Sequence, residues 1–336
     1  MGIFPGGCRI SIVIPVHNGG ENFRRCLASA SAIASPDCEI IVVADGDSDG
    51  SWKLAEESGM RVVRIPESGG PARARNLGAR EARGDILFFV DADVLMSPET
   101  VQLVLAAFQT DPGLAALFGS YDDDPSAGNF LSQYKNLFHH YVHQTARETA
   151  TTFWSGCGAI RREIFSSMSG FDEDFRRPSI EDVELGYRLT KAGYRIRLIK
   201  EIQVKHLKRW GVRSLLRADI LYRALPWTAL ILREGKLLND LNLKLSSRIS
   251  TAAVFLLMAT LAFSVRFPWL LVPSAACALA LLALNRDLYR FFFRKRGLFF
   301  AALVIPWNWL YFFYSGLAFS LGYVRHHLGR IPVKTA

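Results

Sequence analysis

Short apolar runs alternate with segments of helical composition along the first part of the chain. Helical composition covers residues 21–34 and returns after a Gly-Gly-Pro turn, continuing through residue 83. Runs rich in β-branched or aromatic residues, typical of buried strands, lie at residues 9–15, 39–44, 61–65 and 85–90. Strands that alternate with helices at this spacing predict an α/β fold, with a mostly parallel sheet covered by helices on both faces.

The last part of the chain contains three long apolar segments without charged residues, at residues 249–265, 267–285 and 298–323. A membrane-crossing helix needs about 20 apolar residues, with about 17 as the lower limit, so we expect transmembrane helices here. The first two segments fit a hairpin that turns at residues 266–269. The third is interrupted by Pro306, where a re-entrant bend is the alternative to a full crossing. A buried helical core is the alternative to a membrane region.

Basic residues predict the orientation of these segments. Lysine and arginine crowd residues 286–296 and also precede the first segment, which indicates the cytoplasmic side for both sets. A third crossing would put the basic tail, residues 326–336, outside, against the rule that basic loops lie on the cytoplasmic side. A re-entrant bend at Pro306 would return the tail to the cytoplasmic side. Residues 206–248 form a basic amphipathic segment expected at the membrane surface, with a solvated helix packed on protein as the alternative.

Charge divides the chain into two parts. Residues 1–205 carry 22 Lys and Arg against 27 Asp and Glu, whereas residues 206–336 carry 18 against 4. Because 50% of the residues are hydrophobic and only 21% are charged, a disordered chain is excluded. The positive charge accompanies the apolar segments, so a membrane is the expected partner and nucleic acid is not. We therefore expect a cytoplasmic domain at residues 1–205, followed by a multi-pass region in the inner or plasma membrane.

The five cysteines show no CxxC spacing, so they predict neither a disulfide framework nor a zinc site. A reducing compartment is expected for the first part of the chain. The first residues lack a charged region followed by a long apolar stretch, and we expect no secretory signal there.

Polar loops follow three of the predicted strands, after Pro15, Ala44 and Val90, at the edge of the sheet where ligands of parallel sheets bind. Asp91 and Asp93 directly follow a buried strand and could share a divalent metal, because carboxylate oxygens suit Mg²⁺ or Mn²⁺. A solvated turn is the alternative for this pair. Asp45 could accept a hydrogen bond from a nucleotide base, or it could cap a nearby turn.

Five segments in this order resemble the family 2 glycosyltransferases with the GT-A fold: IVIPVHNGGENFRRCL, IIVVADGDSDGS, GGPARARNLGAREARGD, FFVDADV and GFDEDFRRPSIEDVELGYRLTKAGYRI. The resemblance covers about residues 9–205. It implies a Rossmann-like sheet with a nucleotide-diphosphate sugar, a UDP- or GDP-sugar, across the strand ends. It also implies Mg²⁺ or Mn²⁺ as cofactor and inversion at the anomeric carbon.

The resemblance assigns roles to particular residues. Asp45 would read the base, although the family often has two acidic residues where Ala44 and Asp45 stand. Asp91 and Asp93 would hold ribose and the metal that bridges the diphosphate. The remaining donor-binding residues would be Pro15, His17 and Asn18 in the nucleoside pocket, and Gly69, Gly70, Arg73 and Arg75 near the nucleotide.

A second group of acidic residues opens a predicted helix after Ser179. Acids in a first helical turn stabilise the helix dipole, which is one explanation for them. By the resemblance, Asp182 is the general base that deprotonates the acceptor hydroxyl, with Glu181 as the alternative. The resemblance also assigns residues 154–158, with Trp154 and Gly156, to the acceptor side, although Trp154 could equally belong to the core.

Residues 206–210, HLKRW, resemble a degenerate QxxRW motif of processive polysaccharide synthases, with His206 in place of Gln. Arg209 could pair with the diphosphate and Trp210 could stack on the acceptor, or both could anchor the chain at the membrane surface. Processive synthases usually carry membrane helices before the catalytic domain, and this sequence shows none there. We therefore expect transfer of a single sugar to a membrane-embedded acceptor, a lipid or polyprenyl phosphate.

Three other functions compete with this hypothesis. A processive polysaccharide synthase is the alternative within the family. A sugar nucleotidylyltransferase shares the parallel sheet, but it should have a Gly-rich, Lys-containing loop after the first strand, where this chain has Pro-Val-His-Asn. A catalytically silent membrane scaffold would be expected to lose Asp93 or Asp182, and both are present.

Overall fold

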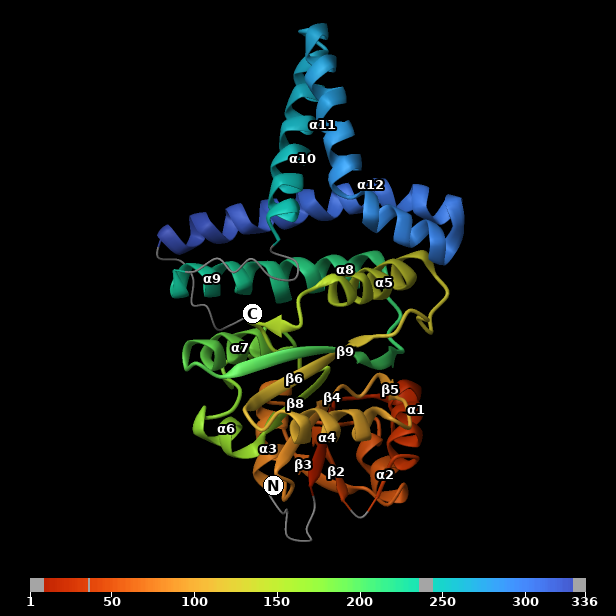
Figure 1. Ribbon diagram of the computed structural model, residues 1–336, viewed down its shortest axis with the longest axis vertical. Helices are drawn as coiled ribbons and strands as arrows, with labels where there is room; N and C mark the ends of the chain where they lie inside the picture. Colours follow the sequence, from red (N-terminus) through yellow and green to blue (C-terminus); the bar gives the residue numbers. More distant parts are fainter. Residues whose placement is uncertain (1–8, 36, 236–243, 329–336) are drawn as a thin grey trace. The chain divides into compact units, whose positions relative to one another are not determined.

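The computed structural model describes residues 9–35, 37–235 and 244–328. The chain divides into two compact units, one ending at Trp210 and the other beginning at Gly211 (Figure 1). The sequence predicted this boundary after residue 205, slightly earlier in the chain than the structure places it. Most of the predicted basic tail, residues 329–336, and part of the predicted surface segment, residues 236–243, lie outside the described residues.

A single mixed sheet organises the first unit. Its parallel half has the order β3-β2-β1-β4, formed by β1 (Ile10–Val16), β2 (Cys38–Asp45), β3 (Arg61–Ile65) and β4 (Ile86–Val90). Beyond β4 the pairing is mixed, through β8 (Cys157–Arg161), β6 (Leu114–Tyr121), β9 (Arg195–His206), β5 (Val94–Met96) and β7 (Thr149–Ala150). Strand β8 is antiparallel to β4 and β6, β9 is parallel to β6, and β5 and β7 are antiparallel to β9. The predicted α/β class is confirmed, with parallel pairing concentrated in the first half.

Alternation along β1 explains how helices cover both faces of the parallel half. Ile10, Ile12 and Ile14 belong to one apolar core with residues of α1 (Gly20–Ser31), α2 (Ser51–Glu57) and α4 (Thr100–Thr110). Val13 points the other way, toward α3 (Pro71–Glu81), where a Cβ on Gly78 would lie 2.4 Å from the Val13 side chain. The close approach of α3 to the sheet therefore requires glycine at this position.

Three more helices complete the first unit. These are α5 (Phe130–Thr145), which packs on β6 and β9, α6 (Arg162–Ser167) and α7 (Glu181–Lys191). The carboxyl ends of β1, β2 and β4 lie at one edge of the sheet because these strands are parallel neighbours. The three polar loops predicted to bind a ligand therefore share that edge.

The second unit is helical. It begins with three consecutive segments, α8 (Val212–Arg217), the π-helical η1 (Ala218–Ala224) and α9 (Leu225–Glu234). Then α10 (Leu245–Ser264), η3 (Pro268–Leu270), α11 (Leu271–Leu284) and α12 (Arg286–His327) follow. Of the described helices, α10 and α12 are long and apolar enough to cross a membrane.

The interruption of the third apolar segment lies elsewhere than predicted. Helix α12 runs through Pro306 without a break, so the re-entrant bend that was one alternative at this residue is not observed. The helix instead changes direction at Gly297, whose φ of 82° and ψ of 178° are not helical. Glycine adopts this backbone conformation readily because it has no Cβ to clash.

Candidate active site

The loops after β1 and β2 are tied to each other by hydrogen bonds. His17 Nδ1 lies 2.6 Å from the carbonyl oxygen of Asp45, and the Asn18 side-chain oxygen accepts the backbone N–H of Ser48 at 2.9 Å. Asp47 accepts the N–H of Asn18 at 3.2 Å, and Asp49 accepts the N–H of Gly20 at 3.0 Å. His17 and Asn18 remain exposed, and Pro15 is half-buried at the end of β1, so the predicted nucleoside-side residues share one surface.

The carboxylate of Asp45 is buried and bound to the loop that opens α3. Its two oxygens accept the backbone N–H groups of Gly69 and Gly70, each at 2.8 Å, and Oδ2 also accepts the Ser68 hydroxyl at 2.9 Å. Both oxygens therefore support the conformation of this loop. Base reading by Asp45 stays a prediction, and the turn-capping role that the sequence also allowed is observed.

Glycine is required at the start of α3. Gly70 has a φ of 91°, and a Cβ on it would lie 2.3 Å from the carbonyl oxygen of Arg176. Arg73, one turn further on, is exposed beside Gly69. Of the two arginines predicted near the nucleotide, Arg73 is thus the one with an accessible guanidinium.

The guanidinium of Arg75 is buried and joins two acidic residues from different elements. Nη2 donates to Asp91 Oδ1 at 2.7 Å, and Nη1 donates to Glu181 Oε1 at 2.8 Å. Although burial alone would lower it, Asp91 and Glu181 raise the pKa of Arg75. Arg75 therefore holds the loop after β4 against the first turn of α7, and its place near the nucleotide, which the resemblance implied, stays a prediction.

Glu181 and Asp182 are neighbours with different surroundings. The Glu181 side chain is only 5% exposed, and burial raises its pKa although Arg75 opposes the rise. Asp182 is half-buried, and its Oδ2 accepts the backbone N–H and the hydroxyl of Ser155 at 3.0 and 3.1 Å. This arrangement favours Asp182 over Glu181 as the group that can meet an acceptor.

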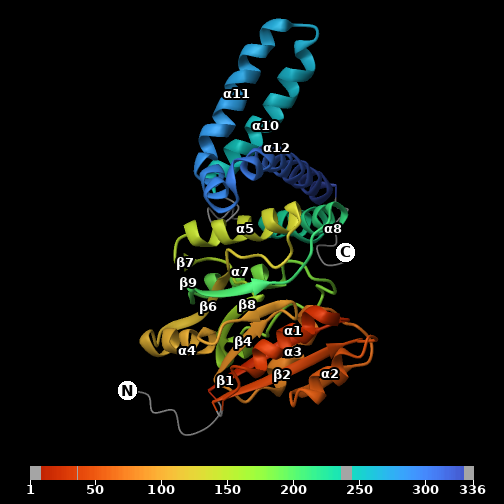
Figure 2. The same cartoon turned by 90° about the vertical axis from the view of Figure 1, so that its right-hand side faces the viewer.

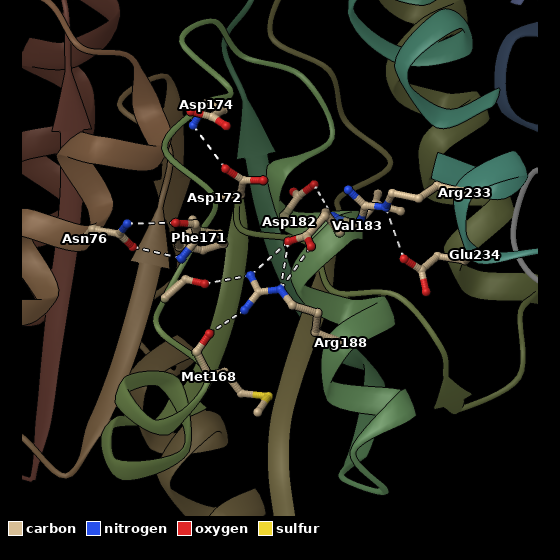
Figure 3. A network of polar contacts seen from close by, with 12 residues as sticks. Asn76, Met168, Phe171, Asp172, Asp174, Asp182, Val183, Arg188, Arg233 and Glu234 are labelled. Atoms are coloured by element: carbon tan, nitrogen blue, oxygen red, sulfur yellow. Dashed lines mark hydrogen bonds and ion pairs between the residues drawn. The ribbon is translucent and has the colours of Figure 1, made fainter. Parts of the chain in front are cut away.

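Side-chain hydrogen bonds attach helix α7 to the segment before it (Figure 3). Arg188 pairs with Glu184 and also donates to the carbonyl oxygens of Met168 and, at 2.7 Å, Gly170. Asn76 of α3 holds the same segment by exchanging two hydrogen bonds, of 2.8 and 2.9 Å, with the backbone of Phe171. Helix α7 is thus fixed to the segment before it, and that segment is fixed to α3.

Asp93 faces a histidine from the end of β9. His206 Nε2 lies 3.5 Å from Asp93 Oδ2, and His206 Nδ1 lies 2.7 Å from the side-chain oxygen of Asn136. An imidazole that donates Nδ1–H to Asn136 turns Nε2 toward Asp93, as a lone pair in the neutral ring and as an N–H donor in the protonated ring. Although burial would raise it, His206 and Lys208 hold the pKa of Asp93 below its usual value.

Asp93 and His206 have the donor atoms to hold a divalent cation together. The side chains of Asp91 and Asp93 stay 32% and 29% exposed, which leaves their oxygens accessible to a ligand. The described residues contain no group of three or more His, Cys, Asp and Glu side chains placed for a metal. Mg²⁺ commonly takes one or two protein carboxylates and completes its shell with water and substrate phosphates. The carboxylates of Asp91 and Asp93 therefore fit such a metal.

Aromatic rings line the region between Asp93 and the Asp182 loop. Tyr121 stacks on His206 with ring centroids 4.3 Å apart, and it meets the edge of Trp154 at 4.9 Å and His139 at 4.4 Å. Gly156 lets the Trp154 ring fold back, because a Cβ there would lie 2.7 Å from that ring. Trp154 is half-buried, so it belongs to this ring cluster and is also partly accessible.

Arg209 and Trp210 differ in their exposure. Arg209 is exposed, as both of its expected roles require. Trp210 is buried, and its backbone N–H donates to the Ser132 hydroxyl at 2.7 Å while its carbonyl oxygen accepts from Asn129 at 2.8 Å. The ring is therefore packed inside the described structure, and its roles in acceptor stacking and membrane anchoring stay predictions.

Sequence reasoning missed several residues that the fold brings to the site. Ser155 lies inside a recognised segment, and its position before Gly156 was the available signal. Tyr121, Asn136 and His139 come from β6 and α5, which no motif covers. A helix with three histidines, at positions 139, 140 and 143, was the only sequence signal there.

Comparison with known proteins agrees with this geometry. Residues 11–168 match the family model for glycosyl transferase family 2. The chain is 28% identical to the pre-mycofactocin glycosyltransferase of Mycobacterium tuberculosis over 223 residues, which cover 63% of this chain and 46% of the relative. It is 29% identical to the validoxylamine A glucosyltransferase of Streptomyces hygroscopicus over 241 residues, 61% of this chain and 55% of the relative.

Among solved structures, the chain is similar to the mannosyltransferase PcManGT from Pyrobaculum calidifontis, determined in complex with GDP-Man and Mn²⁺. The TM-score is 0.58 at 18% identity, over 96% of this chain and 88% of the other, which supports the fold. The first unit is a glycosyl transferase family 2 domain with the GT-A fold. The chain spans about half the length of the curated relatives it matches.

Proposed function

We propose that this chain is an inverting, metal-dependent glycosyltransferase that moves one sugar from a nucleotide-diphosphate sugar to a membrane-embedded acceptor. One observation carries the proposal: Asp93 with His206, and Asp182 with Ser155, flank the same strand edge of a family 2 domain. The first pair has the donor atoms for a metal and the second has the carboxylate for a base. Neither pair is explained by the stability of the fold alone.

The donor is a UDP- or GDP-sugar in this proposal. His17 and Asn18 form the exposed nucleoside side of the site, and Arg73 supplies an accessible positive charge near the Gly69–Gly70 turn. The similar mannosyltransferase binds GDP-Man with Mn²⁺, which supports a nucleotide sugar and a divalent metal. Mn²⁺ or Mg²⁺ held by Asp93 and His206, with Asp91 beside them, would neutralise the charge that develops on the departing diphosphate.

Asp182 takes the proton of the acceptor hydroxyl as the new glycosidic bond forms. Ser155 fixes the orientation of the carboxylate by donating twice to Oδ2. Attack by the acceptor oxygen from the side opposite the leaving diphosphate inverts the configuration at the anomeric carbon. Trp154 offers a partly accessible ring next to this loop, where it can pack against the acceptor.

The second unit supports a lipid acceptor such as a polyprenyl phosphate. Helices α10 and α12 are long and apolar enough to cross a membrane, and many of their large apolar side chains are exposed. We infer that this unit holds the domain at the cytoplasmic face of the membrane. The lipid acceptor is then supplied by the same bilayer that holds the chain.

The test is transfer of labelled sugar from a panel of UDP- and GDP-sugars to lipid extract, using the full chain in membranes. We expect activity with Mn²⁺ or Mg²⁺, none in EDTA, and a loss of about 1000-fold for Asp93→Asn, in the range that a major charge-stabilising group contributes. Glu57→Gln, which removes an exposed acid at the end of α2, is the matched control and should keep full activity. Undiminished transfer in EDTA contradicts the metal role, and a ladder of polymeric products indicates the processive alternative.

A further inference from the structure

Helices α10 and α11 lie side by side along their whole length. Near one end Asn285 donates to the Ser250 hydroxyl at 3.0 Å, and near the other Ser274 donates to the Thr260 hydroxyl at 2.8 Å. The 20 residues of α10 extend about 30 Å, which matches the hydrocarbon thickness of a bilayer. Their outward faces are apolar and exposed, for example at Leu256, Phe263 and Val272, so the hairpin has the length and surface to cross a membrane.

Helix α12 contacts this hairpin at one level only in the contacts of the described residues. Phe313 packs on Phe255 with ring centroids 5.3 Å apart, and a Cβ on Gly316 would lie 2.5 to 2.6 Å from Phe255 and Thr251. Phe312 joins the cluster formed by Val254, Leu257, Cys277 and Leu281. These partners lie between the start and about the middle of α10, and between about the middle and the end of α11. Figures 1 and 2 both show α12 passing across this part of the hairpin.

The same helix runs beside η1 and α9. The Tyr314 hydroxyl donates to Asp219 at 2.8 Å, and further along Gly322 approaches Thr228 so closely that a Cβ would lie 2.9 Å away. The two contacts advance in the same direction along both helices, so the helices are parallel neighbours. Helix α12 is therefore aligned with η1 and α9, and crosses α10 and α11.

A crossing by α12 would carry charge into the bilayer. Tyr314 lies about 25 Å along the helix from Leu298, at about 1.5 Å per residue, and its buried partner is Asp219. An acidic side chain inside the hydrocarbon core is unfavourable. The piece of α12 after Gly297 is also about 45 Å long, which exceeds the hydrocarbon core by about 15 Å.

Six large apolar side chains exposed on α12 beyond Gly297 form one stripe, and Leu298, Phe319 and Tyr323 are exposed beside it. The six recur at spacings of three, four and seven residues, which places them on the same face of a helix: Phe299, Leu303, Leu310, Leu317, Leu321 and Val324. Basic residues stand at both ends of this piece, at residues 294–296 and at Arg325. An apolar stripe between basic ends fits a helix that lies in the headgroup region of one leaflet.

We propose that α12 beyond Gly297 lies in the plane of the membrane surface together with η1 and α9, and that only the α10–α11 hairpin crosses. The inference rests on the proposed membrane association and replaces the third crossing expected at residues 298–323. The first unit and the end of α12 at His327 then lie on the same side of the membrane. Both clusters of basic residues, around Arg290 and Arg325, are then cytoplasmic, so the conflict with the positive-inside rule disappears.

Depth measurements on spin-labelled single-cysteine variants in lipid nanodiscs test this placement. The full chain is used, with Cys8 and Cys277 replaced by Ser; the three other cysteines are buried in the first unit. Labels at Leu310 and Leu317 are expected within about 3 Å of the same depth, because an in-plane helix keeps one face at one level. The matched pair Leu256 and Phe263 of α10, also seven residues apart, should differ by about 10 Å. An equal difference of about 10 Å for the α12 pair overturns the proposal.

Labelling with a membrane-impermeant maleimide in sealed vesicles adds a second readout. His327→Cys is expected to react from the same side as Glu57→Cys, and Val265→Cys at the hairpin tip from the other side. Reaction of His327→Cys from the side of Val265→Cys means three crossings and overturns the proposal. If these placements hold in a chain that transfers no sugar, the proposed function fails while the membrane arrangement stands. A chain that does not enter nanodiscs overturns both.

Discussion

Two sets of carboxylates lie at the same sheet edge, and the fold uses them differently. Asp45 at the end of β2, and Asp47 and Asp49 just after it, accept hydrogen bonds from backbone N–H groups of neighbouring loops. Asp91 and Asp93, after β4, face ionisable side chains instead, Arg75 and His206. The first set shapes loops, whereas the second set is positioned by side chains and keeps about 30% of its surface open.

This difference predicts what substitutions should do. A carboxylate that holds backbone N–H groups should affect stability and binding together when it is changed. Substitution of a carboxylate that a neighbouring side chain positions should lower the activity while the fold persists, provided that the neighbouring side chain keeps a hydrogen-bond partner. Arg75 is the critical case, because it connects Asp91 to Glu181 and has both terminal nitrogens engaged.

The largest effect is expected from Arg75→Met. The change leaves Asp91 and Glu181 without their shared positive charge, and breaking a buried ion pair in this way costs about 3–5 kcal/mol of unfolding free energy. For a unit of this size that corresponds to a fall in melting temperature of roughly 10 °C, measured by thermal unfolding in detergent. Arg73→Met, which removes an exposed arginine from the same helix, should leave the melting temperature unchanged.

A second variant separates positioning from nucleotide binding at Arg75. Combining Arg75→Met with Asp91→Asn and Glu181→Gln removes the unpaired charges and should recover part of the lost stability without recovering sugar transfer. If Arg75→Met instead melts normally and only weakens nucleotide binding, Arg75 contacts the nucleotide as the resemblance implied.

The parallel half of the fold could be predicted because its evidence is local. Each of the strands β1 to β4 is a short apolar run, and the observed bounds differ from the predicted ones by a residue or so. The second half could not, because β9 mixes polar and apolar residues and pairs with β6, β5 and β7, which are distant in the sequence. Its register depends on packing that no single segment encodes.

The same distinction applies to the site and to the membrane region. Motifs identified Asp91, Asp93 and Asp182, but the pairing of Arg75 with Glu181 joins residues 106 positions apart. Tyr121 and Asn136 reach the site only because α5 packs on β6 and β9. Hydropathy predicted the apolar segment at residues 298–323 within α12. It does not predict the orientation of the helix relative to the membrane, because that orientation depends on packing against η1 and α9.

The next effect in size is expected at the proposed base. Asp182→Asn should lower kcat by about 100-fold or more, the usual contribution of a general base, with donor binding near normal. Ser155 can still donate to the remaining oxygen, so the loop should keep its conformation. Glu181→Gln is the contrasting variant and should mainly lower the melting temperature, because Glu181 is the buried partner of Arg75. Normal transfer by Asp182→Asn together with inactive Glu181→Gln would reverse the assignment of the base.

The smallest effect is expected at Asp45, which tests whether the carboxylates that hold backbone N–H groups act through the conformation of their loops. Asp45→Asn converts one oxygen into a donor that faces the N–H of Gly69 or Gly70, which leaves a buried N–H without an acceptor and costs about 1–3 kcal/mol of stability. Because the loop at the start of α3 is then distorted, affinity for UDP and GDP should fall by similar factors in calorimetric titration. Asp49→Asn, in the more exposed part of the neighbouring loop, should have a smaller effect on both. A loss of affinity for only one nucleotide at an unchanged melting temperature would mean that Asp45 reads the base, and the contrast between the two sets of carboxylates would then fail at this residue.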